Sequence, residues 1–471
     1  MTKLIKLTLR EQHLVELQCM LLRQDGKEMA AYLLCGQAAI QSDPWDENPS
    51  VKYLSREIVS IPDSEIISHS PQHVAWATDS FVKALKLAQD KDMIVAIVHS
   101  HPGGFAAFSQ QDDINEPDLV QLAQNRNGAH ARLISLILTP DGGLIGRCWT
   151  DPETYEPISL ICTVGDRIQL HYPDRGKAIP SQVFQRQSLA FGEAFNHDMS
   201  MLRVGIVGCG GTGSAVAMLL PRLGVKQIVL FDRDVVEATN LNRLHGATLM
   251  DAQNQRPKVE VIRREIESLG IGVQVKTYQS WISNTSCRDA LKSCDVIFSC
   301  TDDHAGRLFL NRFAYFYLTP VFDLGLAIEI SNSIPPWTQS LDGRVTTLIP
   351  GGTCLLCREV IDLVVARDEA LKREQPAEYE GRKAEAYVIG EGNPSPAVVT
   401  FTTGVANMAV EELIHRLQGF RGEVGAIANR VRKFYLAEDR KQGAKSKENC
   451  LICNSEQYWG RGDIEPFLDQ V

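Results

Sequence analysis

The stretch of this chain that decides its fold is residues 202–214, LRVGIVGCGGTGS. The run 202–207 is short, apolar and rich in β-branched residues, which predicts a buried strand. A turn rich in glycine follows, and residues 215–223 have the pattern of a helix. A strand, a glycine turn and a helix in this order let the backbone approach a phosphate, which the free amides at the helix N-terminus can bind. The glycines of this predicted nucleotide loop are Gly208, Gly210, Gly211 and Gly213.

A second predicted strand, 227–231, ends at Asp232, at the distance from the glycine loop that suits a contact with a ribose hydroxyl. The glycine pattern alone does not separate a dinucleotide from ATP. The polar residues that follow favour ATP, because cations can neutralise a triphosphate and a carboxylate at a strand's C-terminal edge can hold magnesium against it. Each of these residues taken singly is more often a surface charge. They are Asp234, Asn240, Arg243, Lys258 and, after a predicted strand at 295–300, Asp302.

As a set, these residues resemble the adenylation domain of the ThiF/MoeB and ubiquitin-activating family, which forms an acyl-adenylate at the C-terminus of a ubiquitin-like protein. The resemblance implies ATP and magnesium as cofactors. It assigns the ribose to Asp232, magnesium to Asp302, and the phosphates to the cluster of Asn240, Arg243 and Lys258, although the spacing from Arg243 to Lys258 is longer than in the family.

The segment 184–187, Phe-Gln-Arg-Gln, resembles a further motif of that family. There an arginine reaches the γ-phosphate bound by the partner subunit, so the resemblance implies a catalytic role for Arg186 and a homodimer. A solvated helix residue is the alternative for Arg186.

Two Cys-x-x-Cys pairs stand far apart in the second half of the chain. Together they can close a tetrahedral four-sulfur zinc site with no open position, and such a site is structural. The same separated pairs occur in the family named above, whereas free or redox-active dithiols are the alternative. The predicted ligands are Cys354, Cys357, Cys450 and Cys453.

Residues 358–449 contain no cysteine. Activating enzymes that form a thioester carry a nucleophilic cysteine in this crossover region, but here 382–388 has alanine at 384 and 386 and no thiol. We therefore expect the acyl-adenylate to pass directly to an external nucleophile, such as the thiol of a conjugating enzyme, an amine or a sulfur donor.

A second chemical pattern lies near the N-terminus, where His99-Ser100-His101-Pro102 is followed by Ser109 and Asp112. The run 93–98 predicts a buried strand, and side chains two apart on a strand share a face, so both imidazoles point the same way. Ser109 is a predicted helix N-cap, which puts Asp112 in the first helical turn. Two histidines and a carboxylate leave zinc a fourth position for water, although surface histidines and a capping pattern are the plainer interpretation of each part.

This spacing resembles the signature of the JAB/MPN (JAMM) metallopeptidases, which cleave after the C-terminus of ubiquitin-like proteins. The resemblance implies a catalytic zinc on His99, His101 and Asp112, and a role for Ser109 in holding the oxyanion. It also implies a glutamate general base near an early strand. Glu28, before the predicted strand 30–36, fits that place, and Glu16 is the alternative.

The 471 residues are 44% hydrophobic and 23% charged, as in globular proteins with sizeable cores. A formal net charge of −10 argues against a nucleic-acid partner. The sequence shows no signal peptide and no apolar run near the roughly 18 residues of a membrane span, so we expect a cytoplasmic protein in which clustered cysteines bind metal.

We therefore expect an α/β protein with a JAB/MPN-like zinc peptidase domain at 1–150, a connector or short strand pair at 151–180, and a Rossmann-like adenylation domain with a structural zinc at 181–471. The expected function is bifunctional: zinc-dependent release of a ubiquitin-like β-grasp protein, and ATP-dependent adenylation of its C-terminal glycine. Activation of a sulfur-carrier protein is one alternative, and a non-catalytic scaffold that binds a ubiquitin-like protein is another.

Overall fold

The computed structural model describes residues 4–173, 182–331, 333, 337–384, 396–463 and 467–468. The chain forms two compact units. The first takes Met1–Lys177 together with Phe316–Leu318 and Gln457–Gln470, and the second takes most of the remaining residues.

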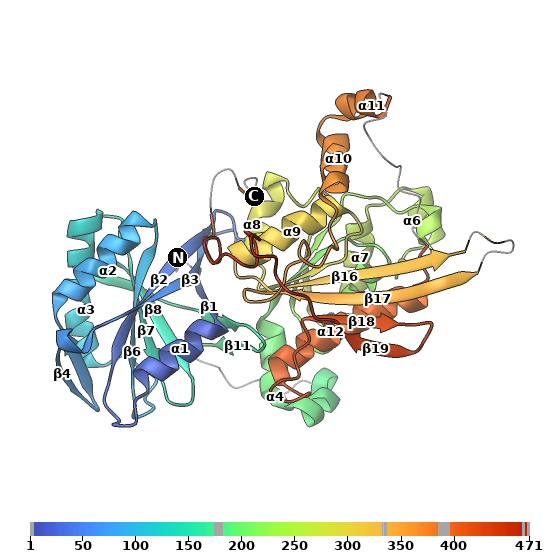
Figure 1. The fold of residues 1–471 in the computed structure, drawn as a ribbon. Helices are drawn as coiled ribbons and strands as arrows, with labels where there is room; N and C mark the ends of the chain where they lie inside the picture. Colours follow the sequence, from blue (N-terminus) through green and yellow to red (C-terminus); the bar gives the residue numbers. More distant parts are fainter. Residues whose placement is uncertain are drawn as a thin grey trace. The chain divides into compact units, whose positions relative to one another are not determined.

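The first unit is built on a nine-stranded mixed sheet of order β11-β10-β1-β3-β2-β6-β7-β8-β9. Helix α1 packs its buried leucines on one face of the sheet, and α2 and α3 cover the other face (Figure 1). The strands of this sheet are β1 (Leu4–Arg10), β2 (Ala30–Ile40), β3 (Ser50–Ser60), β6 (Ile94–Ser100), β7 (Leu133–Leu138), β8 (Leu144–Asp151), β9 (Thr154–Pro157), β10 (Leu160–Val164) and β11 (Ile168–His171). The hairpin β4 (Ile66–Ser70) and β5 (His73–Trp76), the short η1 (Asp63–Glu65), and the helices α1 (Glu11–Leu21), α2 (Thr78–Asp90) and α3 (Gln110–Asn127) complete it.

The register between β2 and β6 positions the first candidate site. These strands run antiparallel, and Ala30 lies opposite His99. One step further along the same register, Ser100 donates its backbone amide to the carbonyl of Met29 at 2.9 Å. The chain just before β2 is thereby brought opposite the chain just after β6, which puts Glu28 across from His101.

Residues 151–173 do more than connect the two units. The sequence predicts a connector or a short strand pair, whereas three strands form here, and all three belong to the nine-stranded sheet. Strand β10 pairs in parallel with β1, so that Leu9 lies opposite Thr163. The sheet of the first unit therefore extends beyond residue 150.

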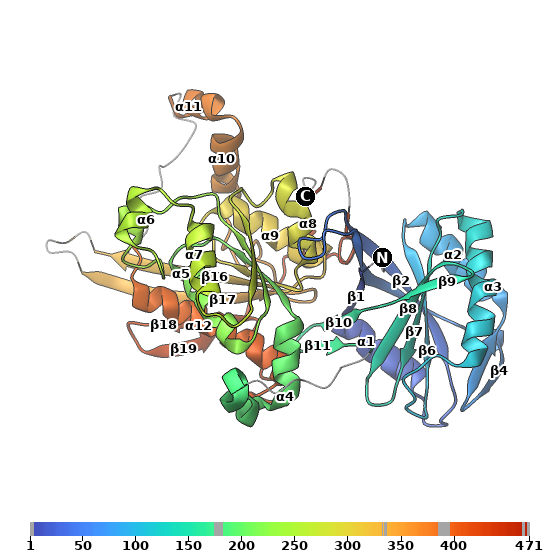
Figure 2. The same cartoon turned by 180° about the vertical axis from the view of Figure 1, so that it is seen from behind.

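The second unit is built on an eight-stranded sheet of order β14-β13-β12-β15-β16-β17-β18-β19. Strands β16 to β19 of this sheet are labelled in Figure 2. The first five strands of the sheet are parallel and the rest antiparallel. Its strands are β12 (Arg203–Val207), β13 (Gln227–Phe231), β14 (Gln274–Tyr278), β15 (Val296–Ser299), β16 (Val321–Ile330), β17 (Thr338–Leu348), β18 (Asn429–Lys433) and β19 (Glu438–Lys441). The helices are α4 (Gln185–Met201), α5 (Gly211–Leu219), α6 (Leu249–Gln253), α7 (Lys258–Glu267), α8 (Thr285–Ser293), α9 (His304–Phe316), α10 (Leu363–Glu374), α11 (Pro376–Ala384) and α12 (Val399–Gln418), with short turns at η2 (Gln182–Phe184), η3 (Pro221–Leu223) and η4 (Ala238–Asn240).

The parallel part of this sheet has the strand order of a Rossmann-like fold. Strand β12 is flanked by β13 on one side and β15 on the other, so the strand order reverses at β12 and a crevice opens at the carboxyl ends of these strands. The predicted α/β class and the Rossmann-like second domain are confirmed. Among the described residues, no helix is both long enough and apolar enough to cross a membrane.

Candidate functional sites

Two imidazoles and a carboxylate converge at the end of β6. The Nε2 atoms of His99 and His101 lie 3.2 Å apart, and the Nε2 of His99 lies 3.6 Å from the Oδ1 of Asp112. All three donor atoms lie within 4.8 Å of one another. A tetrahedral zinc with bonds of 2.0–2.1 Å would separate its ligand atoms by about 3.3 Å, so this donor set fits the ion.

The surroundings of these donors favour metal binding. His101 donates a hydrogen bond from Nδ1 to the carbonyl of Phe105 at 2.8 Å, which leaves its Nε2 lone pair free for a metal. Burial lowers the pKa of His99 to about 4, so its ring is neutral at pH 7, as a metal ligand must be.

Glu28 lies beside this cluster but is not one of its three donors. Its Oε1 is 3.9 Å from the Nε2 of His101, and the residue is only 7% exposed. Burial and the charge of Asp112 raise the pKa of Glu28 to about 7, which suits a group that accepts and returns a proton near neutral pH. Glu16, the alternative, is exposed on α1.

Ser109 is the N-cap of α3, as the sequence predicts. Its Oγ accepts the amide of Asp112 at 3.2 Å, and Asp112 Oδ2 accepts both the amide and the hydroxyl of Ser109, at 2.7 and 2.8 Å. The hydroxyl thus faces the carboxylate that completes the metal-binding set.

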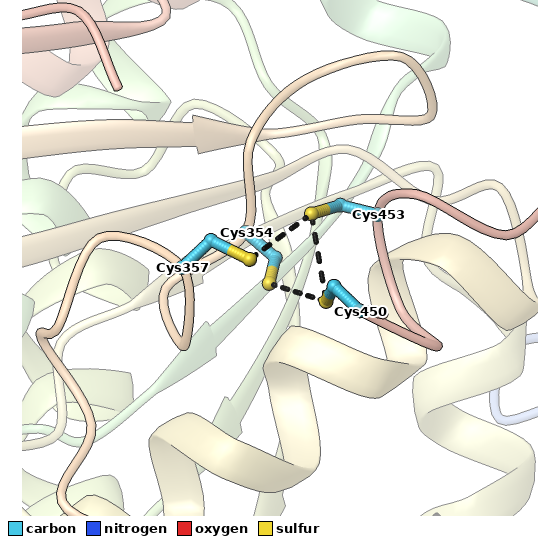
Figure 3. Close-up of side chains that lie close together, drawn as sticks. All are labelled: Cys354, Cys357, Cys450 and Cys453. Atoms are coloured by element: carbon cyan, nitrogen blue, oxygen red, sulfur yellow. Dashed lines mark hydrogen bonds between the residues drawn. The ribbon is translucent and has the colours of Figure 1, made fainter. Parts of the chain in front are cut away.

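The four cysteines of the two Cys-x-x-Cys pairs converge in the second unit (Figure 3). Three Sγ–Sγ distances among them are 3.6, 3.6 and 3.7 Å. A disulfide would require about 2.05 Å, whereas the edge of a tetrahedron with zinc–sulfur bonds of about 2.3 Å is about 3.8 Å. The backbone amide of Lys447 also points at the Sγ of Cys357, at 3.3 Å, as expected for a thiolate. This donor set fits a closed zinc site.

A pocket lies at the carboxyl ends of β12, β13 and β15, where the reversal of strand order opens the crevice. Helix α5 begins at this pocket with Gly210 as its N-cap. Most of the residues predicted to bind nucleotide line it: Gly208, Gly210, Gly211, Asp232, Asp234, Arg243, Lys258 and Asp302.

Asp232 is tied to the glycine turn. Its carboxylate accepts the amides of Cys209, at 2.6 Å, and Asp234, at 2.8 Å. Burial raises its pKa, and the nearby charge of Lys258 opposes that rise. Burial disfavours the charged form of Lys258, but the carboxylates of Asp232 and Asp234 outweigh it and hold the pKa of the ammonium above its usual value. The two aspartates thus keep Lys258 charged inside a pocket that Arg243 also lines.

Three predicted nucleotide-site residues do not line the pocket. Gly213 packs against the turn so closely that a Cβ there would meet the carbonyl of Gly208 at 1.8 Å, so its role is packing of helix on strand. Asn240 is buried and its Oδ1 accepts the amide of Glu237 at 3.1 Å, which makes it a cap of the η4 turn. Arg186 is exposed on α4. Residues 385–395 of the crossover region lie outside the described residues.

The structure adds residues that sequence reasoning missed. Arg307 on α9 lines the pocket, where it approaches the fully buried Asp323 at 3.5 Å, and Trp281 lines it beneath the guanidinium of Arg233. The position of Arg307 on the helix that follows Asp302 was the one signal available. Near the first site, Arg147 forms a buried ionic cluster for which the sequence carries no pattern.

Comparisons with known proteins match both parts of the chain. The ThiF family matches residues 184–453, and prokaryotic homologues of the JAB domain match residues 10–150. The chain is 30% identical over 161 residues to the sulfur carrier protein ThiS adenylyltransferase of Escherichia coli K12, a match that covers 33% of this chain and 63% of that protein. It is 28% identical over 155 residues to the SAMP-activating enzyme E1 of Haloferax volcanii, covering 33% and 52%. It is 30% identical over 183 residues to ubiquitin-like modifier-activating enzyme 5 of Gallus gallus, covering 36% and 43%.

These matches span less than two thirds of each of these three relatives. Among solved structures, E. coli MccB with ATP is similar at 17% identity and a TM-score of 0.44, covering 59% of this chain and 76% of that one. A similarity of that degree supports no conclusion about function.

Proposed function

The chain belongs to the ThiF family and also carries a JAB-like domain, and from this premise we propose that it is a two-site enzyme acting on the C-terminal tail of a ubiquitin-like β-grasp protein. The first unit hydrolyses the peptide or isopeptide bond that follows the tail. The second unit uses ATP to adenylate the terminal carboxylate. The names of the relatives, which refer to ThiS, SAMP and a ubiquitin-like modifier, support a small-protein substrate.

The peptidase proposal is carried by the convergence of His99, His101 and Asp112 with Glu28 beside them. Zinc held by the three donors would supply Lewis-acid activation of water. Glu28, which lies beside the three donors, would take up the proton of the attacking water and return it to the leaving amine. Ser109 would orient Asp112 through its backbone amide, and its hydroxyl would turn to donate its hydrogen bond to the oxyanion.

The adenylation proposal is supported by the pocket at the carboxyl ends of β12, β13 and β15. The amides of the glycine turn and of the N-terminus of α5 would bind phosphate, and Asp232 would bind the ribose. Arg243 and Lys258 would stabilise the negative charge that develops at the α-phosphate. Magnesium on Asp302 would neutralise the phosphates. The tail carboxylate would attack the α-phosphorus and pyrophosphate would leave.

We further propose that no enzyme thioester forms, because residues 358–449 contain no cysteine. The adenylate would pass to an external nucleophile. The four-cysteine site would be structural, and Arg186 would contribute to the pocket of a second subunit in a homodimer.

The peptidase is tested with a β-grasp protein that carries a C-terminal extension, with cleavage followed by mass spectrometry. Replacing Glu28 by Gln should lower cleavage by at least about 10²-fold while zinc content stays unchanged, because only proton transfer is lost. Glu16→Gln is the matched control and should cleave like the wild type. Undiminished cleavage by Glu28→Gln would contradict this assignment.

The adenylation site is tested by ATP–pyrophosphate exchange that depends on a β-grasp protein. Asp302→Asn should reduce exchange by about 10²-fold or more, because the metal that neutralises the phosphates loses its carboxylate. Asp289→Asn on α8, whose side chain is 28% exposed and lies outside the pocket, is the control. Equal exchange by both variants would overturn the assignment.

Activation of a sulfur-carrier protein is the second candidate. The 30% identity to a ThiS adenylyltransferase and the absence of a crossover cysteine both favour it. The acceptor separates the two candidates. A thiocarboxylate formed with a persulfide donor would support sulfur transfer, whereas an adduct with a conjugating-enzyme thiol or a lysine would support conjugation.

A further inference from the structure

The helix that supplies Asp112 has almost no apolar attachment where it begins. Of residues 110–116, Glu116 alone is buried, and Ile114 is 66% exposed. The apolar residues that attach α3 to the sheet, Val120 and Ala123, come two turns later. Pro117 inside the helix also removes one backbone hydrogen bond in this region. Packing alone therefore does not fix the position of the first turn.

A single arginine on β8 replaces that missing packing. Arg147 Nε donates to Glu116 Oε2 at 2.8 Å, and its Nη1 donates to Asp113 Oδ1 at 2.5 Å. Glu116 also accepts the hydroxyl of Ser135 at 2.5 Å and the indole N–H of Trp149. The side chains of Arg147 and Glu116 are 3% and 7% exposed, so they form a buried charge pair. Its hydrogen bonds join α3 to the strands β7 and β8.

The same arginine also reaches the segment that leads into the helix. Its guanidinium lies 3.9 Å from the centre of the Phe108 ring. Its Nη2 is buried and has no hydrogen-bond acceptor among the described residues, which fits an N–H directed at the aromatic face. Phe108 in turn lies edge-on to the ring of His99, with centroids 6.4 Å apart. Arg147 therefore contacts residues next to two candidate metal ligands: the helix turn that carries Asp112, and the ring that lies against His99 on β6.

We propose that Arg147 is a positioning residue of the first candidate metal centre: through Asp113 and Glu116 it fixes the turn that carries Asp112, and through Phe108 it supports the ring of His99. This inference rests on the proposed zinc site in the first unit. The inference concerns metal affinity and not proton transfer. Among the described residues, Arg147 contacts neither Glu28 nor the three donor atoms of the metal site.

The test is the zinc affinity of each site in the full-length protein, measured as metal retained per chain in competition with a graded chelator. Arg147→Met should weaken zinc binding at the histidine site by about 10–100-fold, the range typical of residues that orient metal ligands. Zinc at the four-cysteine site serves as the internal control and should not change. Arg147→Lys should restore part of the affinity, because a lysine keeps the charge but not the forked geometry or the ring contact. Arg132→Met removes another half-buried arginine of this unit, which contacts the Tyr53 hydroxyl, and should bind both metals normally.

A folded Arg147→Met protein with unchanged zinc affinity at the histidine site would overturn the inference and leave the proposed function intact. If that variant does not fold, the zinc affinity of Asp113→Asn tests the inference instead. The Asp113 side chain is 56% exposed, and this substitution weakens only one contact of Arg147. It should still weaken zinc binding, by less than Arg147→Met, and an unchanged affinity would overturn the inference. A wild-type protein that holds zinc only at its cysteines would overturn both the proposed peptidase site and this inference.

Discussion

Two helix starts in this chain have the same local structure and opposite surroundings. Ser109 and Asp112 open α3, and Thr248 and Asp251 open α6. In both, the carboxylate accepts the backbone amide and the hydroxyl of the capping residue, at 2.7 and 2.8 Å in α3 and at 2.9 and 2.7 Å in α6. The returning bond from the aspartate amide to the capping oxygen is 3.2 Å in each.

The free side of each carboxylate differs. Oδ1 of Asp112 faces His99 at 3.6 Å, and the side chain is 21% exposed. Oδ1 of Asp251 meets Arg264 at 2.8 Å and Arg256 at 3.5 Å, and that side chain is 4% exposed. The neutral imidazole of His99 leaves the carboxylate of Asp112 able to bind a metal, whereas the guanidinium groups already neutralise that of Asp251. A capping pattern therefore sets where the carboxylate is held, and the residues opposite it decide what it does.

The largest expected effect comes from replacing the aspartate of the first pair. Asp112→Asn should weaken zinc binding in the first unit by more than about 100-fold and reduce cleavage accordingly, because a charged ligand becomes a neutral amide. With no zinc at the first site, the unfolding midpoint should change little, since an asparagine side chain can still accept the backbone amide of Ser109 in the capping box. Zinc content and thermal unfolding measure the two effects. A large loss of stability with zinc retained would place Asp112 in the same structural role as Asp251.

The second pair should respond in the opposite way. Asp251→Asn removes the charge that pairs with Arg264 and Arg256, and should destabilise the second unit by about 1–2 kcal/mol. The loss is no larger because both arginines are partly exposed and solvent screens the pairs. Urea unfolding at pH 7 measures this change. Zinc binding in the first unit should be the same as in the wild type, and any loss there would contradict the separation of roles.

Acid should erase the difference between Asp251→Asn and the wild type. The hydrogen bonds from Arg264 hold the pKa of Asp251 well below its usual value of 3.8. A carboxyl whose pKa is depressed by folding contributes stability above its unfolded pKa, and that contribution is lost as the pH falls toward the folded pKa. The difference in unfolding free energy should therefore be constant from pH 7 to about pH 5 and shrink below about pH 4. A difference that grows on acidification would contradict the depressed pKa.

The parts of the molecule that could be predicted from sequence are those in which one short pattern determines one local structure. The predicted strands at 202–207 and 227–231 are found as β12, at 203–207, and β13, and Ser109 caps its helix as expected. The four cysteines converge as their pairing predicts, because two Cys-x-x-Cys turns supply four sulfur ligands that can close one tetrahedral site.

The rest depends on contacts between distant segments. Strand β10 pairs in parallel with β1, which lies about 150 residues earlier in the sequence. No local pattern in 160–164 specifies that partner. Arg147 and Glu116 look like ordinary surface charges in the sequence, because a strand and a helix must first pack together before their burial can be known. Asn240 is the converse case, since its side chain caps a turn instead of facing the pocket.

The smallest expected effects come from removing the capping hydroxyls, and they test the comparison most closely. Ser109→Ala and Thr248→Ala should each cost about 1 kcal/mol of stability, since each removes one acceptor from a helix N-terminus. Ser109→Ala should also weaken zinc binding by about 10-fold, because Asp112 loses a hydrogen bond that fixes its orientation, whereas Thr248→Ala should leave the metal unaffected. Chelator competition on the two variants measures the contrast. If Ser109→Ala lost stability alone, the serine would be a cap and nothing more, and the position of Asp112 would depend on the buried cluster around Arg147.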